Sequence, residues 1–157
     1  MIITPSYSFT RPANTTQYSA NDLVANNATA GSVVPMSFYV GKGGLASGRI
    51  KRVRLFKDVE TTTAASFKVH LFSASPTVTN GDNGALAVAT GSTYLGAVAV
   101  DMSSGAFATT TDLFHAAVAN PEIAFDALTT IYGLLEAIGA YAPGSGEGFT
   151  VTLEVEK

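Results

Sequence analysis

The residues whose types could carry chemistry are few in this chain of 157 residues. It contains two histidines and twelve carboxylates, and it has no cysteine and no tryptophan. The nearest match to a local pair is Asp112, three residues before His115, while His70 has no other histidine or carboxylate three or four positions away. Ligand pairs and acid–base pairs on one element need such spacing. Neither histidine is therefore predicted to be catalytic or metal-binding, and without cysteine there is no thiolate nucleophile or thiolate metal site.

Two weaker arrangements also point away from catalysis. The run Asn80-Gly81-Asp82-Asn83 offers three oxygen side chains, as calcium loops do, but lacks the downstream bidentate glutamate of an EF-hand, so a turn without metal is favoured. Glu136 with Glu154 would be a candidate carboxylate pair for glycoside hydrolysis, yet the chain offers no tryptophan platform for a sugar. No nucleophile elbow, phosphate-binding loop or zinc-protease motif occurs. We therefore predict no catalytic, cofactor-binding or metal-binding residue, and no enzyme.

Charge is sparse and unevenly distributed. Charged residues make up 13% of the chain and the net charge is −3. Residues 101–157 hold eight acids and one base, whereas five of the nine bases fall within nine residues: Arg49, Lys51, Arg52, Arg54 and Lys57. Such polarity favours ordered contacts between unlike surfaces over nonspecific nucleic-acid binding, which usually needs a strongly basic domain.

The segment 49–57 reads as a strand. Val53 and Leu55 share one face, and Arg52 and Arg54 share the other with Ile50 and Phe56. Arginine stems cover apolar surface while their guanidinium groups pair with acids. The partners are Glu154 and Glu156 of the same chain or the acids of another subunit.

A period of two in the hydrophobic residues dominates the chain. Residues 34–40, 65–71 and 149–156 alternate apolar and polar side chains, which predicts half-buried strands. Residues 94–100 and 131–137 are apolar on both faces and are predicted to be central strands. Residues 111–118, with Thr111 or Asp112 as the N-cap, are the one helix candidate.

Several glycine- and asparagine-rich turns separate these strands, and the first thirty residues differ in composition. They mix proline, asparagine, threonine and serine, and read either as an edge strand at 6–10 followed by a long loop or as an extended arm across a neighbouring subunit. We predict an all-β fold: a single-domain β-sandwich, jelly-roll-like, with an extended N-terminal arm. The arm and loop span residues 1–30 and the sandwich spans residues 31–157.

The sequence shows neither an apolar stretch long enough to span a membrane nor the pattern of an export signal. The longest apolar stretches fall far short of the roughly 20 residues that a spanning helix needs, and the N-terminus has neither a basic region nor a continuous apolar region. We expect no membrane contact and synthesis in the cytoplasm of a host cell.

Several segments resemble small structural proteins of tailed bacteriophages, in particular capsid decoration or cement proteins. The resemblance is carried by residues 3–12, 18–26, 31–36, 53–57, 70–77 and 132–137. It implies a β-rich structural protein bound to the outside of a capsid lattice, with no catalytic residues.

The predicted function is therefore to decorate and cement a bacteriophage capsid at capsomer junctions, with location on the capsid surface of the virion. The partners are the major capsid protein and further copies of this chain, as a dimer or a trimer, without nucleic acid or small-molecule substrate. The alternative is a carbohydrate- or receptor-binding module of a phage tail or spike. From the residue pattern, the predicted interface consists of Ile2, Ile3, Tyr7, Phe9, Arg11, Arg49, Lys51, Arg52, Arg54 and Lys57.

Overall fold

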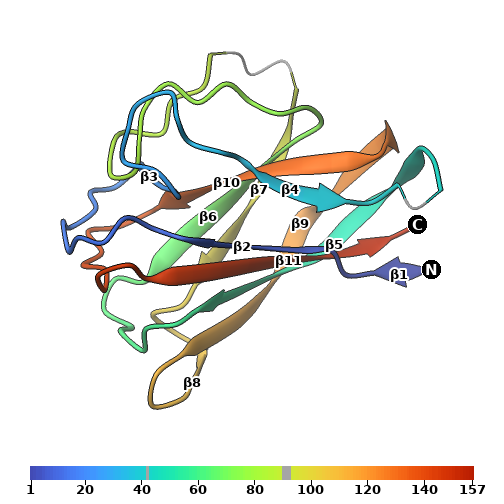
Figure 1. Ribbon diagram of the computed structural model, residues 1–157. Helices are drawn as coiled ribbons and strands as arrows, with labels where there is room; N and C mark the ends of the chain where they lie inside the picture. Colours follow the sequence, from blue (N-terminus) through green and yellow to red (C-terminus); the bar gives the residue numbers. More distant parts are fainter. Residues whose placement is uncertain (42, 90–92) are drawn as a thin grey trace.

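The computed structural model describes residues 1–41, 43–89 and 93–157. Eleven antiparallel strands in these ranges build two sheets that pack face to face, and the described residues form no helix (Figure 1). The all-β, single-domain, jelly-roll-like sandwich predicted from the period-two pattern is confirmed.

The first sheet is ordered around its C-terminal strand. β11 (Gly148–Glu156) pairs with β5 (Ala46–Lys57), β5 pairs with β9 (Leu113–Leu128), and β9 pairs with β8 (Phe107–Ala108). On the other side of β11, β1 (Ile2–Ile3) and β2 (Ser6–Thr10) follow one another along the same strand.

The second sheet is ordered around β10 (Thr130–Ala137). This strand pairs with β6 (Ser66–Phe72), and β6 pairs with β7 (Tyr94–Asp101). On its other side β10 pairs with β3 (Asp22–Val24) near one end and with β4 (Met36–Tyr39) near the other.

The core lies between the sheets and is filled by the inward half of each alternating strand. Phe149, Val151, Leu153 and Val155 of β11 are fully buried, and so are the alternate residues of β6 that begin at Phe67. Full burial of such a side chain stabilises the fold by about 1.5–3 kcal/mol. The alternation is thus the main sequence signal for the sandwich.

A bulge in β5 changes which of its residues face the core. The pairing of β5 with β9 shifts between Ile50 and Arg52, and the pairing with β11 shifts between Glu154 and Val155. The extra residue in the bulge turns Ile50 inward, where it is fully buried beside Val53. The prediction that Ile50 shares the face of Arg52 and Arg54 is therefore wrong.

The N-terminal residues lie in the sheets of their own chain rather than in an extended arm. β2 covers residues 6–10, the edge strand that was the alternative to the arm, and Phe9 of β2 stacks on Phe149 of β11 at 5.6 Å between ring centroids. β3 also lies within the first thirty residues and pairs with β10. The physical reason is that unpaired backbone groups on the side of β11 gain hydrogen bonds from this segment.

The helix predicted at 111–118 is wrong. β9 begins at Leu113, and its next residues pair with β5 over the whole segment. Leu113 is buried while Phe114 is exposed, which is the alternation of a strand. Cross-strand pairing and burial override a weak local capping signal.

The two strands that were predicted to be central behave differently. β10 has strands on both sides and is buried on both faces, as predicted. β7, in contrast, pairs only with β6 within the described residues and lies at the edge of the second sheet, so its central placement is wrong. Its outward residues are partly exposed because no described strand continues the sheet beyond it.

Loops cover part of the outer face of the second sheet. Leu134 and Phe72 point away from the main core, and they pack with Leu23, Ala25 and Val78 in a second apolar cluster. The connections that follow β3 and β6 supply Ala25 and Val78 to this cluster. Both connections run over the second sheet (Figure 1). The outer face of the first sheet has no comparable apolar cluster among the described residues.

Candidate functional site

Three phenylalanines form a row across the bare outer face of the first sheet. Phe56 of β5 is opposite Phe114 of β9, and Phe114 is opposite Phe107 of β8. The ring centroids are 4.8 Å and 6.3 Å apart in turn. Phe107 is 69% exposed and Phe114 is 43% exposed. We call these residues the aromatic row; large exposed apolar groups that gather in this way mark interaction surfaces.

Arg54 lies in the next row of the same face. It is opposite Thr152 of β11 and Ala116 of β9, neither of which carries a charge. Its side chain is exposed, and no carboxylate of the described residues lies within 4.0 Å of it. Arg54 is thus a cation beside the aromatic row that forms no ion pair with the described residues.

The other exposed bases of β5 are paired within the chain. Arg52 lies 3.3 Å from its cross-strand partner Glu154. Lys51 contacts Glu122 and lies 3.4 Å from Glu156, and Arg49 is 3.6 Å from Glu122. Of the two predicted partners for the basic strand, the acids of the same chain are observed, with Glu122 as an addition.

These surface pairs also shift proton affinities. The hydrogen bond to Glu122 raises the pKa of Lys51, and the same bond lowers the pKa of Glu122. Exposed pairs of this kind add little to stability because water and salt screen them. Their effect is to neutralise the charge of Arg49, Lys51 and Arg52 where a partner would meet it.

A hollow of about 590 Å³ opens over the aromatic row. Its side-chain lining combines the row with Arg54 and with the hydroxyl groups of Thr150 and Thr152, and none of its lining residues is acidic. His115 also lines it, and the Nδ1 atom of this residue is buried without a hydrogen-bond partner among the described residues. The hollow is of the size that small ligands or partner side chains occupy.

Two of the predicted interface residues, Arg11 and Lys57, are inside the molecule, which corrects their assignment to an exposed surface. Arg11 is 2% exposed and its guanidinium lies 3.2 Å from Asp82. Tyr18 donates a hydrogen bond to Asp82 at 2.6 Å and accepts one from Arg11 at 2.7 Å. Arg11 therefore supplies the positive charge beside the loop 80–83, where the calcium alternative would have placed a metal.

Lys57 forms a second buried network. Its ammonium group lies 3.0 Å from Glu147 and donates to the Tyr141 hydroxyl at 2.8 Å. Tyr141 in turn donates to Glu147 at 2.6 Å. Lys57 is turned inward because it follows Val53 and Leu55 on the core face of β5, and burial lowers its pKa.

The two networks meet through their tyrosines. The rings of Tyr18 and Tyr141 stack at 6.4 Å between centroids. Burial, followed by the neighbouring Asp82 and Glu147 respectively, raises the pKa of both hydroxyl groups, which stay protonated. Because every charged group here has a partner, the networks fix the loops at one end of the sandwich rather than present a reactive group.

The remaining predicted interface residues lie along the N-terminal edge. Ile2 is 65% exposed, whereas Ile3, Tyr7 and Phe9 are partly buried and pack against the core. The structure therefore does not gather the ten predicted residues on one surface. Arg54 is the one that it brings to the aromatic row, whose three phenylalanines the sequence reasoning missed.

A polar cluster that the sequence did not reveal lies on the outer face of the second sheet. His70 contacts Glu136 through Nε2, and its Nδ1 lies 3.1 Å from the Tyr94 hydroxyl. Lys68 is opposite Glu136 in the sheet and 3.8 Å from it. Residues 70 and 136 come from strands far apart in sequence, so no local spacing could signal the pair.

The pair Glu136 and Glu154 is not brought together. Glu136 points outward from the second sheet toward His70, and Glu154 points outward from the first sheet toward Arg52. In the described part of the chain no three side chains of His, Asp or Glu are grouped so as to hold a metal ion. No helix of the described chain is long and apolar enough to cross a membrane.

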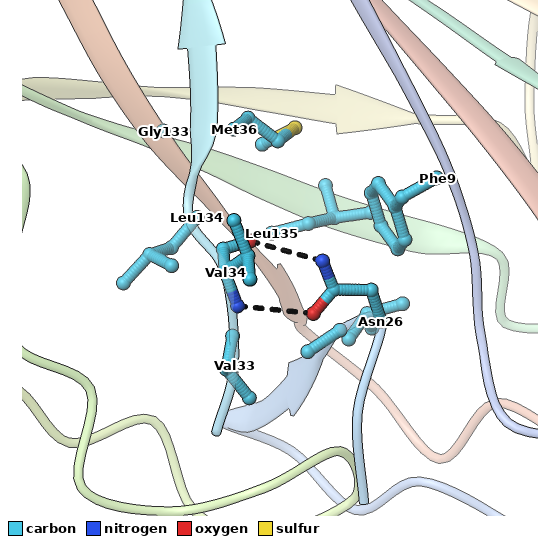
Figure 2. Close-up of a pocket in the computed structure, with 10 residues that line it drawn as sticks. Phe9, Asn26, Val33, Val34, Met36, Gly133, Leu134 and Leu135 are labelled. Carbon is cyan, nitrogen blue, oxygen red and sulfur yellow. Dashed lines mark hydrogen bonds between the residues drawn. The ribbon is translucent and has the colours of Figure 1, made fainter. Parts of the chain in front are cut away.

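A small hollow near β3 and β4 is filled by the protein itself. Asn26 donates to the carbonyl of Val34 and accepts from its N–H, both at 3.1 Å (Figure 2). The Asn26 side chain links the residues after β3 to those before β4. The cavity that remains has a volume of about 10 Å³, which is enough for one water. The site is a structural clamp.

Comparisons with known proteins show remote likenesses only. No family model and no curated protein matches the chain. A carbohydrate-binding module, CBM28, described as specific for non-crystalline cellulose, matches over 97% of this chain and 73% of its own, with 12% identity and a TM-score of 0.43. A chain of Desmodium yellow mottle tymovirus matches over 99% and 85%, with 12% identity and a TM-score of 0.29. A chain of Israeli acute paralysis virus matches over 99% and 67%, with 10% identity and a TM-score of 0.31.

Proposed function

We propose that the protein is a structural component of a tailed-bacteriophage virion that binds the outside of the capsid and cements capsomer junctions. The observation that carries the proposal is the aromatic row beside Arg54 on the bare outer face of the first sheet. Aromatic residues and arginine are enriched at the centres of protein interfaces, where lysine and glutamate are depleted. The sequence resemblance to decoration proteins supplies the partner, the major capsid protein.

The face is suited to stabilise a capsid through the area that it buries on binding, and this requires no reacting group. A standard interface buries about 800 Å² per partner, roughly a tenth of the 7090 Å² that this chain exposes. The two buried ion networks hold the sandwich rigid, so that binding orders few additional groups. Dimers or trimers of the chain would bind at many equivalent positions on the outer surface of the capsid lattice. The modest free energies of these contacts then sum to a large stabilisation of the shell.

The test is binding to undecorated capsids by the double variant Phe107→Ala/Phe114→Ala. Both side chains are exposed, so the variant is expected to fold normally but to bind at least about tenfold more weakly. Leu45→Ala is the matched control, because Leu45 is 71% exposed and lies outside the row. Cosedimentation with capsids measures the affinity, and an unchanged affinity of the double variant would overturn the proposed face.

A carbohydrate- or receptor-binding module of a tail or spike is the second candidate. The same aromatic row favours it, because sugar rings stack on aromatic faces. Copy number separates the two functions: a decoration protein is present in hundreds of copies per particle, and a tail component in a few to a few dozen. Quantitative protein staining of purified particles gives this number.

A further inference from the structure

The charges of β5 leave one cation without an acid. Along its outer face, Arg49, Lys51 and Arg52 each lie within 4.0 Å of a glutamate of the same chain. Arg54 has threonine on one side and alanine on the other in the sheet register. The chain has a net charge of −3. Even so, Arg54, which lies next to the hollow, is the one exposed base of β5 that is not paired with a carboxylate of the described residues.

The hollow itself is complementary to an acidic, partly apolar partner. Phe107 and Phe114 supply apolar walls, Arg54 supplies the positive charge, and no aspartate or glutamate among the lining residues opposes a negative group. A guanidinium group binds a carboxylate through two parallel hydrogen bonds. A partner that covers the aromatic row would exclude water from this contact and so strengthen it.

We propose that the hollow over the aromatic row accepts an acidic segment of the partner protein, with a carboxylate on Arg54 and an apolar side chain against Phe107 and Phe114. This inference rests on the proposed function and names the chemistry that the capsid must present. A carboxylate of this segment pairs with Arg54 in the same way as Glu154 pairs with Arg52 within the chain.

A protein segment fits this lining better than a sugar does. A pyranose ring carries several hydroxyl groups, and each needs a hydrogen-bond partner when it leaves water. Phenylalanine offers none, and the polar side chains of the lining are limited to Arg54, His115, Thr150 and Thr152. Apolar side chains of a protein are buried against the row without such a cost.

The experiment measures binding to undecorated capsids at low and high salt for Arg54→Gln, Arg54→Glu and Arg54→Lys. Arg52→Gln is the matched control, because Arg52 is two residues away on the same face but already paired with Glu154. We expect Arg54→Glu to weaken binding by roughly tenfold or more, Arg54→Lys to retain part of the affinity, and Arg52→Gln to bind as the parent does. Arg54→Gln should also flatten the salt dependence.

The outcomes separate this inference from the proposed function. If Phe107→Ala/Phe114→Ala loses binding while all Arg54 variants bind as the parent does, the docking face stands and the acidic segment is overturned. If every variant binds normally, the face itself is overturned. Competition by soluble polyglutamate that depends on Arg54 supports the inference. Competition by polygalacturonate but not by polyglutamate overturns the protein partner in favour of an acidic glycan.

Discussion

At the scale of single residues, this protein buries two ion pairs where no binding partner can contact them. Arg11 with Asp82, and Lys57 with Glu147, are ion pairs whose side chains are almost completely buried. Such pairs add little net stability over apolar residues, but removal of one partner costs about 3–5 kcal/mol because a buried charge is left alone. Substitutions of Arg11 or Lys57 would therefore report on folding and not on binding.

The buried tyrosines predict how stability depends on alkaline pH. The raised pKa of Tyr18 and of Tyr141 keeps both hydroxyl groups protonated in the folded state, while in the unfolded chain they ionise near pH 10. Their contribution is therefore complete below pH 10 and is lost as the pH rises above it. Each tyrosine should lower the free energy of unfolding by roughly 1.4 kcal/mol per pH unit in that range.

Urea unfolding at several pH values from 9 to 12 measures this slope. Tyr18→Phe should reduce the slope of the free energy of unfolding against pH by the roughly 1.4 kcal/mol per pH unit that one tyrosine contributes. This holds whatever the substitution does to the stability at pH 7. Tyr7→Phe is the control, because Tyr7 of β2 belongs to neither buried network. Equal slopes for the parent and Tyr18→Phe would show that this hydroxyl ionises in the folded state.

At the scale of elements, the N-terminal segment is part of the first sheet. β2 pairs with five residues of β11, and the following Arg11 closes the buried network with Asp82. Capsid binding by this segment therefore cannot be separated from folding by truncation. Surface substitutions on the aromatic row avoid that difficulty.

Deletion of residues 1–12 should abolish cooperative unfolding or lower the melting temperature strongly. The deletion exposes one side of β11, removes the stacking of Phe9 on Phe149, and leaves Asp82 buried without its cation. Deletion of residues 1–3 is the control, because it removes only the two-residue β1 and should cost about 1–2 kcal/mol. Circular dichroism during heating distinguishes the two; a normal transition for the longer deletion would contradict the assigned role of β2.

At the scale of the whole molecule, the two outer faces of the sandwich are unequal. The chain covers part of its second sheet with its own loops, which pack on a second apolar cluster, whereas the aromatic row of the first sheet stays exposed. This asymmetry makes the first sheet the face on which the proposed docking is placed. Under the proposed docking, the first sheet faces the capsid and the loops over the second sheet face away from it.

The proposed cementing function predicts that the protein raises the heat resistance of the particle. Capsids saturated with the protein are expected to release DNA at a higher temperature than bare capsids, because a ligand that binds only the intact shell stabilises it by mass action. The release is followed with a DNA-binding dye during heating. Phe107→Ala/Phe114→Ala at the same concentration should give little increase, and an increase equal to that of the parent would contradict docking through the row.

The amino-acid sequence alone was sufficient for the core-facing residues of the regularly alternating strands, and for the small number of histidines and the lack of cysteine. Alternation in β6 and β11 is a local property, because successive side chains of a strand point to opposite faces whatever the strand pairs with. The sequence also predicted the basic strand, with Glu154 and Glu156 as one of two alternatives for its acidic partners, but not Glu122. The same local reasoning failed at 111–118, where pairing with β5 decides the conformation.

Tertiary structure alone decided which distant groups meet. Lys57 and Glu147 are 90 residues apart, and His70 and Glu136 are 66 residues apart. The aromatic row exists only because β5, β8 and β9 lie in register, and Ile50 faces the core only because of a bulge. Register is set by the pairing of whole strands and the fit of the core between sheets, and a shift of one residue would turn each side chain to the other face.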